Sequence, residues 1–243
     1  MIKVRNIEVA FEGKNIFSGI NLDVPESTTA VILGRNGCGK SVLLKCVAGL
    51  IKPATGDILL DEVNKDNTGE KKRVEIGYVF QKGGLFDSMS VYDNIAFALR
   101  RRNIAEIEIQ RKAIEALKKV GLFDVETRFP QELSGGMQKR VSLARSLCME
   151  PTHMIYDDPT AGLDPVLTDS IAELLNDIRN VKRVTSLVVT HDLTLVEKVA
   201  DSVHLLYNGE MVFSGTKTAF FNNGNEYTDQ FIKGELDGPF SAF

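Results

Sequence analysis

Residues 34–41 read Gly34-Arg35-Asn36-Gly37-Cys38-Gly39-Lys40-Ser41, which matches the pattern GxxxxGK[ST] in full. In this pattern the glycines let backbone N–H groups approach phosphate oxygens, and the helix that follows adds its positive N-terminus. The flanking residues support the match, because 28–33 is an apolar run typical of a buried strand and 41–48 favours a helix. We therefore predict that Lys40 contacts the β- and γ-phosphates of a nucleotide and that Ser41 binds Mg²⁺.

A second candidate phosphate site is the segment Leu133-Ser134-Gly135-Gly136-Met137, which lies just before a helical run at 138–149. Taken alone, it could be a serine N-cap followed by flexible glycines. Beside the loop at 34–41 it gains another interpretation, since Ser134 and the two glycines again offer a helix N-terminus to an anion. Two such helix starts in one chain fit an arrangement in which they face one nucleotide from opposite subunits.

Two carboxylates follow the apolar strand predicted at 153–157. Asp157 ends the strand and is expected to hold Mg²⁺ through a water, because Mg²⁺ keeps part of its hydration shell. Asp158 comes next and is placed to orient or deprotonate an attacking water. The alternative for Asp158 is a structural one, in which it caps the turn at Pro159.

Two further polar residues follow predicted strands, and ligands in open α/β sheets bind at the carboxyl ends of the strands. His191 follows the strand at 186–190, and Gln81 follows the strand at 76–80. We expect both to join the site, with the Gln81 amide reaching the metal or a water. His153 and His204 have no such context and are interpreted as ordinary histidines.

Two residues have equally plain structural alternatives. Asp164 ends the tight turn at 161–164 and precedes a helix, so it could belong to the nucleotide site or be only an N-cap. Phe11 lies in an early turn, where it could stack on a purine or belong to the core.

The composition is that of an ordinary globular protein, with 43% hydrophobic and 26% charged residues in a chain of 243. Short strands alternate with helices, which predicts an α/β fold, and residues 90–122 read as a helical insertion.

The longest apolar runs are far shorter than a membrane helix, and the first residues lack the apolar core of a signal peptide. A net charge of −4 argues against a duplex nucleic-acid binder. Three cysteines without CxxC spacing suit a reducing compartment.

Taken in order, these motifs resemble the ABC ATPase family over residues 2 to about 215. The resemblance implies a P-loop ABC ATPase fold at 2–232, with an N-terminal antiparallel β part, a helical subdomain at about 88–150 and a tail at 233–243. It implies ATP and Mg²⁺ as cofactors and ATP hydrolysis as the activity. The implied catalytic residues are Asp158, His191 and Gln81, and the implied metal ligands are Ser41, Gln81 and Asp157. The implied nucleotide-binding residues are Phe11, Gly34, Arg35, Asn36, Gly37, Cys38, Gly39, Lys40, Ser41, Val42, Ser134, Gly135, Gly136 and Asp164.

A narrower resemblance is to the Mce/Mla-type phospholipid transport ATPases. It rests on residues 80–91, on Met137, and on the ending at 230–239, although Gly84 stands where that group usually has Ala. The partners implied are a second copy of the chain in an ATP-sandwich homodimer, integral membrane permease subunits and an Mce-type substrate-binding protein, with no nucleic acid. The location implied is peripheral, on the cytoplasmic face of the cell or inner membrane.

One departure from the family is Asp158, where Glu is usual. The shorter side chain predicts slow hydrolysis, and it keeps open a nucleotide-gated switch that scarcely turns over. An importer ATPase for a polar solute such as an amino acid is another alternative. ABC ATPases that act on DNA or the ribosome usually carry long coiled-coil insertions or tandem domains, and neither is visible here. Cys38 lies near Lys40 and a helix N-terminus, a setting that predicts a lowered thiol pKa. The alternative is that position 38 merely tolerates any small residue.

Overall fold

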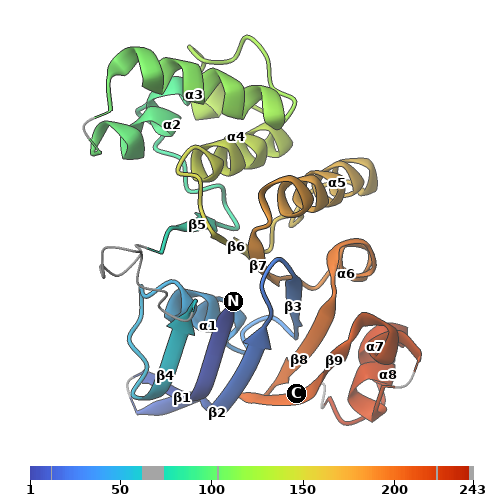
Figure 1. Cartoon of the computed structure of the whole chain (residues 1–243). Coiled ribbons are helices and arrows are strands. Elements are labelled where there is room, and N and C mark those ends of the chain that lie inside the picture. The colour runs from blue at the N-terminus through green and yellow to red at the C-terminus, as the bar shows by residue number, and fades with distance from the viewer. Residues whose placement is uncertain (12, 62–73, 103, 223, 241–243) are drawn as a thin grey trace.

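The computed structural model describes residues 1–11, 13–61, 74–102, 104–222 and 224–240. Figure 1 shows its strands in the middle and lower parts of the view and the helices of residues 91–147 at the top. The strands are β1 (Ile2–Phe11), β2 (Lys14–Val24), β3 (Thr29–Leu33), β4 (Thr55–Leu60), β5 (Ile76–Val79), β6 (His153–Asp157), β7 (Thr185–Val189), β8 (Ser202–Tyr207) and β9 (Glu210–Thr216). The helices are α1 (Lys40–Val47), α2 (Val91–Arg100), α3 (Glu106–Lys119), α4 (Gly135–Leu147), α5 (Pro165–Lys182), α6 (Leu193–Val199), α7 (Lys217–Asn222) and α8 (Glu226–Lys233), with a 3-10 turn at Pro130–Glu132.

The first sheet is antiparallel and has the order β2-β1-β4. In β2, buried residues alternate with exposed ones towards its end, as expected when one face of a sheet packs on a core. The strand begins at Lys14, because its pairing with β1 continues as far as Phe11 opposite Lys14.

The second sheet has the order β5-β6-β7-β3-β8-β9, and its strands are parallel except for β9. Every residue of β3, β6 and β7 is buried, which explains why these strands appear as continuous apolar runs rather than alternating ones. Helix α1 packs against β6 and β7. The predicted fold class, an α/β core with an N-terminal antiparallel part and an inserted helical part, is confirmed.

The helices α2, α3 and α4 pack against one another and lie above the ends of β5 and β6 in Figure 1. Their shared core includes Ile95, Leu117 and Val141. Helix α2 begins at Val91, near the start of the helical insertion expected at 90–122. The reason is a local cap, since the Ser90 hydroxyl accepts a hydrogen bond of 3.0 Å from the Asp93 N–H.

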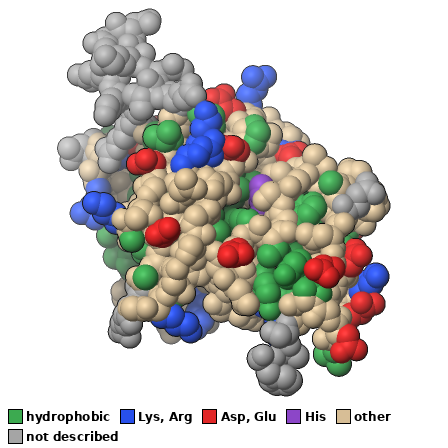
Figure 2. Space-filling model, turned by 90° about the horizontal axis from the view of Figure 1, so that it is seen from below, with side chains coloured by type: hydrophobic (Ala, Val, Ile, Leu, Met, Phe, Trp, Pro, Cys, Tyr) green, Lys and Arg blue, Asp and Glu red, His purple; other side chains and the backbone are tan. Residues whose placement is uncertain are grey.

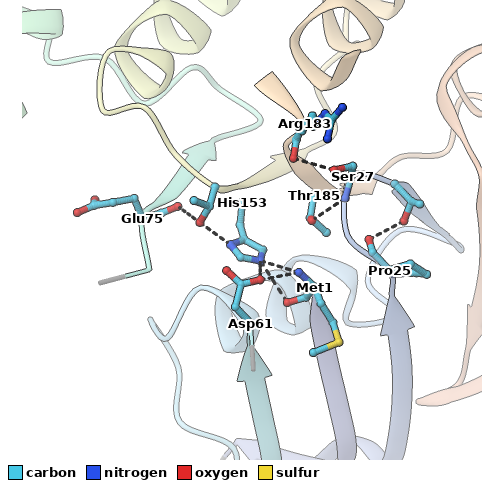
Figure 3. A network of polar contacts seen from close by, with 10 residues as sticks. Met1, Pro25, Ser27, Asp61, Glu75, His153, Arg183 and Thr185 are labelled. Carbon is cyan, nitrogen blue, oxygen red and sulfur yellow. Dashed lines mark hydrogen bonds and ion pairs between the residues drawn. The ribbon is translucent and has the colours of Figure 1, made fainter. Parts of the chain in front are cut away.

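A polar network around His153 joins the two sheets (Figure 3). His153 starts β6 and is buried, and its Nε2 lies 3.3 Å from Asp61 Oδ1 and 3.2 Å from the Met1 carbonyl oxygen. Its Nδ1 lies 2.9 Å from the Thr152 hydroxyl. Asp61 directly follows β4, so this network holds the three-stranded sheet against the start of β6, at the opposite end of that strand from Asp157. The interpretation of His153 as an ordinary residue agrees with this structural position.

The last described segment folds back onto α8. The Gln230 side chain accepts a hydrogen bond of 2.7 Å from the Phe240 N–H and donates one to the Glu235 carbonyl. The buried ring of Phe240 packs against the rings of Tyr207, Tyr227 and Phe231. Residues 234–240 are therefore an ordered part of the fold.

The surface seen from below carries acidic and basic side chains scattered among patches of hydrophobic ones, without a large basic area among the described residues of this face (Figure 2). None of the helices that the structure describes combines the length and the apolar character needed to cross a membrane.

His204 gives a prediction about stability and pH. Burial lowers its pKa to about 4, against an ordinary value near 6.5, so the unfolded chain binds this proton first as the pH falls. The stability that neutral His204 contributes is full above about pH 6.5 and is lost as the pH falls towards 4. We expect the His204→Gln variant to show a shallower fall in unfolding free energy between these pH values, by on the order of 3 kcal/mol. Urea titrations at each pH measure it, and parallel profiles for variant and wild type would contradict this role of His204.

Candidate functional site

The loop at 34–39 connects the buried strand β3 to α1, and the first residue of α1 is Lys40. The Lys40 Nζ donates hydrogen bonds to the carbonyl oxygens of Gly34 (2.7 Å) and Arg35 (2.8 Å), so the loop curls around the ammonium. The N-cap residue of α1 is Gly39, which has no side chain to cap the helix. Its first N–H groups are thus available to an external acceptor, as an anion site at a helix start requires.

Two glycines of this loop are required by its geometry. Gly39 has φ 102°, and a Cβ there would lie 2.8 Å from the Ile16 side chain. At Gly34 a Cβ would approach the Leu206 carbonyl oxygen. Any other residue at these positions would push the loop away from the strands that support it.

Asp157 ends β6 and is buried, with both carboxylate oxygens engaged. The Ser41 hydroxyl donates to Oδ1 at 2.8 Å, and the Tyr78 hydroxyl lies 3.3 Å from Oδ2. Burial and then the charge of Asp157 raise the pKa of Tyr78, so the phenol keeps its proton and acts as a donor. The structure thus brings together Ser41 and Asp157, as the sequence predicted, and adds Tyr78.

Asp158 is buried, and its backbone has φ 49°, a left-handed conformation that Asp tolerates better than most residues. Its Oδ1 accepts a hydrogen bond of 3.1 Å from the Thr190 hydroxyl. Its Oδ2 lies 3.1 Å from His191 Nδ1 and 3.4 Å from Gln81 Nε2. Asp158 therefore contacts both of the other residues that the sequence placed in the catalytic set, His191 and Gln81.

The register of the parallel strands explains this meeting. Asp157 of β6 lies opposite Val189 of β7, and Val189 lies opposite Ile32 of β3. The residues that follow all three strands consequently emerge along one edge of the sheet. β5 pairs with β6 on the other side and delivers Gln81 to the same edge.

Ser134 is the N-cap of α4, and its hydroxyl accepts a hydrogen bond of 3.3 Å from the Met137 N–H. Gly135 and Gly136 begin the helix, and Ser134 and Gly135 are exposed. Figure 1 shows α4 above β5 and β6, whereas α1 lies below them. Within one chain, the segment 134–136 and the loop 34–41 are thus not brought together.

The remaining predicted residues lie as follows. Asp164 is the N-cap of α5 and accepts hydrogen bonds of 2.9 Å from the N–H groups of Val166 and Leu167. Val42 lies in α1 beside Ser41. The exposed Arg35 and Asn36 form the outer turn of the loop at 34–39. Phe11 is the last residue of β1, and its side chain lies outside the described part of the structure.

The expectation of a lowered pKa for Cys38 is wrong. Burial raises the pKa of this thiol, and the nearby charge of Lys40 offsets only part of the effect. The thiol is enclosed by its own loop, since its Sγ fills the space where a Cβ at Gly34 would lie. It has the environment of a packing residue.

Three residues of the site were missed by the sequence analysis, namely Tyr78, Thr190 and Lys139. Lys139 is buried, and its Nζ lies 3.2 Å from the carbonyl oxygens of Gln81 and Asp158. Tyr78 and Thr190 lie within three residues of Gln81 and His191, so the rule that polar residues gather at strand ends could have found them. Lys139 lies within a helix, where a charged residue is ordinary, so its sequence position does not mark it as part of a site.

The donor set suits Mg²⁺ bound to a triphosphate. Among the described residues, no cluster of three or more His, Cys, Asp or Glu side chains could hold a metal by itself. Mg²⁺ does not require one, because it is usually held by one or two carboxylates together with substrate phosphates and water. Ser41 and Asp157 would supply oxygens to the metal, and the loop at 34–39 with the N-terminus of α1 would supply the phosphate site.

The family comparison agrees with this geometry. Residues 17–161 match the family model described as ABC transporter. A protein of Mycobacterium leprae named "Probable ribonucleotide transport ATP-binding protein mkl" is 37% identical, over 98% of this chain and 70% of that protein. The chloroplastic protein TRIGALACTOSYLDIACYLGLYCEROL 3 of Arabidopsis thaliana is 36% identical over 98% of this chain and 75% of its own length. The methionine import ATP-binding protein MetN of Carboxydothermus hydrogenoformans is 32% identical over 96% of this chain and 71% of its own length.

Two solved structures are similar throughout. The protein cbiO1 from Clostridium perfringens, part of the ABC transporter complex cbiONQ, superposes with a TM-score of 0.80 at 32% identity, covering 91% of this chain and 90% of that one. The dimeric ATP-binding cassette MJ0796 in a post-hydrolysis state, bound to ADP and Pi, gives a TM-score of 0.78 at 28% identity, covering 89% and 98%. The phosphate loop and the paired carboxylates agree with this similarity. The chain belongs to the ABC transporter family and is an ATP-binding subunit that hydrolyses ATP with Mg²⁺.

Proposed function

We propose that this chain hydrolyses ATP in composite sites formed by two copies of itself, and that it thereby powers a membrane permease that transports lipid. The observation that carries the proposal is the separation, within one chain, of two helix starts that can each bind phosphate. A second copy related by a two-fold axis would bring the exposed Ser134 and Gly135 to the loop at 34–41 of its partner.

In the proposed site, each residue has a separate task. Lys40 and the loop at 34–39 bind the β- and γ-phosphates, and Phe11 stacks on adenine. Ser41, Asp157 and Gln81 would hold Mg²⁺, which neutralises phosphate charge when bound. Asp158 orients the attacking water, and His191, 3.1 Å from it, contacts the γ-phosphate. Asp164 acts at the partner's site in addition to capping α5.

The similar proteins support the proposed partners and location. The MJ0796 cassette is a dimer that holds ADP and Pi, which supports a homodimer here. The protein cbiO1 is part of a transporter complex, which supports docking on permease subunits at the cytoplasmic face of a membrane. The chain is then a peripheral subunit, and an Mce-type substrate-binding protein would complete the assembly.

Lipid is the proposed cargo because of two separate likenesses. The stretch at 80–91 resembles the Mce/Mla-type phospholipid transport ATPases. The Arabidopsis relative bears the name of a galactolipid. A polar solute is the second candidate, since the other relatives are named for methionine import and ribonucleotide transport.

The proposed role of Asp158 predicts opposite effects for two substitutions. Asp158→Asn removes the charge that orients the water, and we expect turnover to fall by on the order of 10²-fold. Asp158→Glu restores the reach of the usual acid, and we expect turnover to rise severalfold although the left-handed backbone favours Asp. Steady-state phosphate release from Mg-ATP by the complex with its permease measures both.

Nucleotide binding, followed with a fluorescent ATP analogue, serves as the control because Asp158 contacts neither Lys40 nor Ser41 in its hydrogen bonds. Equal or lower turnover in the Glu variant would show that this site is built around the shorter acid. Undiminished turnover in the Asn variant would remove Asp158 from the catalytic set.

The surface that docks on the permease is predicted beside Gln81. Phe86 is 43% exposed and its ring packs on Phe97, itself partly exposed, so the pair offers an apolar anchor. We expect Phe86→Asp to weaken retention of the membrane partner by on the order of tenfold or more, because such anchors dominate interfaces. Affinity purification of the tagged chain from solubilised membranes measures the loss.

Val181→Asp is the matched control, since Val181 is 78% exposed on α5. A complex that keeps its permease despite Phe86→Asp would place the docking surface elsewhere. In the purified complex, stimulation of ATP hydrolysis by phospholipid vesicles supports the lipid cargo, whereas stimulation by methionine or ribonucleotides alone supports the second candidate.

A further inference from the structure

Lys139 is a buried cation that the roles assigned above do not use. Its side chain lies one turn into α4 and is only 8% exposed. Lysine is almost never so buried unless its ammonium is paired. Here the partners are two backbone carbonyls, those of Gln81 and Asp158, each 3.2 Å from Nζ.

The two carbonyls belong to the two segments that meet at the proposed catalytic acid. Gln81 follows β5 and reaches Asp158 Oδ2 with its own amide at 3.4 Å. Lys139 therefore closes a small ring: it bonds to both backbones, and the side chains of these residues bond to each other. A residue with this position can set the separation between Gln81 and Asp158.

Hydrogen bonds hold both the backbone N–H and the backbone carbonyl of Asp158. Its N–H donates to the Val189 carbonyl at 2.9 Å, and its own carbonyl accepts from Lys139 and from the Ala161 N–H. These bonds maintain the left-handed backbone at φ 49°, which directs the carboxylate towards Thr190 and His191. Without the ammonium, the direction of the carboxylate would depend on weaker contacts.

Helix α4 makes further hydrogen bonds to the segment 78–84. Ser146 lies seven residues after Lys139, hence on the same face of the helix, and its hydroxyl lies 3.2 Å from the Tyr78 carbonyl. From another face, Arg145 donates to the carbonyl of Gly84 at 2.8 Å. The helix that begins with Ser134 and Gly135 is thus bonded to the loop that carries Gln81.

We propose that Lys139 is a positioning residue for ATP hydrolysis, whose buried ammonium fixes Gln81 and Asp158 relative to each other and to the start of α4. Lys139 makes no hydrogen bond to the loop at 34–39 or to Ser41, so we expect its loss to affect the hydrolysis step more than ATP binding. The inference rests on the proposed role of Asp158.

The test compares Lys139→Met, which keeps the apolar stem and removes the charge, with Lys118→Met, which removes an exposed lysine of α3. For Lys139→Met we expect kcat for ATP to fall by on the order of tenfold or more, with KM changed less than about twofold, because misplacement by about 1 Å costs up to 10²-fold in rate. Lys139→Arg retains a cation and should recover part of the loss. Lys118→Met should match the wild type.

Hydrogen exchange of the amides at 81–86 supplies a readout that does not depend on Asp158. We expect faster exchange there in Lys139→Met, and unchanged exchange in β3 and β7. An unchanged kcat overturns the proposal, and so does a fall in kcat accompanied by faster exchange throughout the chain, which identifies a core residue. If Asp158→Asn keeps full activity while exchange at 81–86 still rises in Lys139→Met, the role of Asp158 fails and the structural link made by Lys139 stands.

Discussion

The parallel pairing of β7 with β3 on one side and with β6 on the other is the constraint on which the site depends. All three strands are buried along their whole length, so a shift in register would move apolar side chains out of the core. The register aligns Ile32, Val189 and Asp157, and the loop at 34–39, His191 and Asp158 follow directly. The chemistry of the site is in this sense a consequence of how three apolar strands pack.

The same edge must hold two buried carboxylates, which is costly unless each oxygen has a partner. Asp157 has Ser41 and Tyr78, and Asp158 has Thr190, His191 and Gln81. Each carboxylate oxygen therefore has a hydrogen-bonding partner within the chain. Lys40 is held by two loop carbonyls in the same manner. The polar groups of the site are thus held by hydrogen bonds within the chain itself.

Much of this arrangement could be predicted from the sequence, because its signals are local. These signals all lie at strand ends: the glycine pattern at 34–41, the acids at the end of β6, Gln81 after β5 and His191 after β7. The strands themselves lie where the sequence predicted them. The strand β9 was missed although Asn208-Gly209 forms a two-residue turn with positive φ at both positions, a strong hairpin signal. The predicted pKa shift of Cys38 was wrong in direction, because enclosure of the thiol by the folded loop outweighs the charge of Lys40. Lys139 depends on how α4 packs against two loops, and no local pattern reports such packing.

One chain separates the two helix starts to which we assign phosphate binding, so the central claim is that a second copy completes each site. The most direct test mixes two inactive chains, one with Lys40→Ala and one with Gly135→Asp, in the complex with the permease. A mixed dimer then contains one site with an intact loop from one chain and an intact Ser134–Gly136 start from the other. The account predicts that the mixture regains ATP hydrolysis that neither variant shows alone. A mixture as inactive as its components would show that the two segments must act within the same chain.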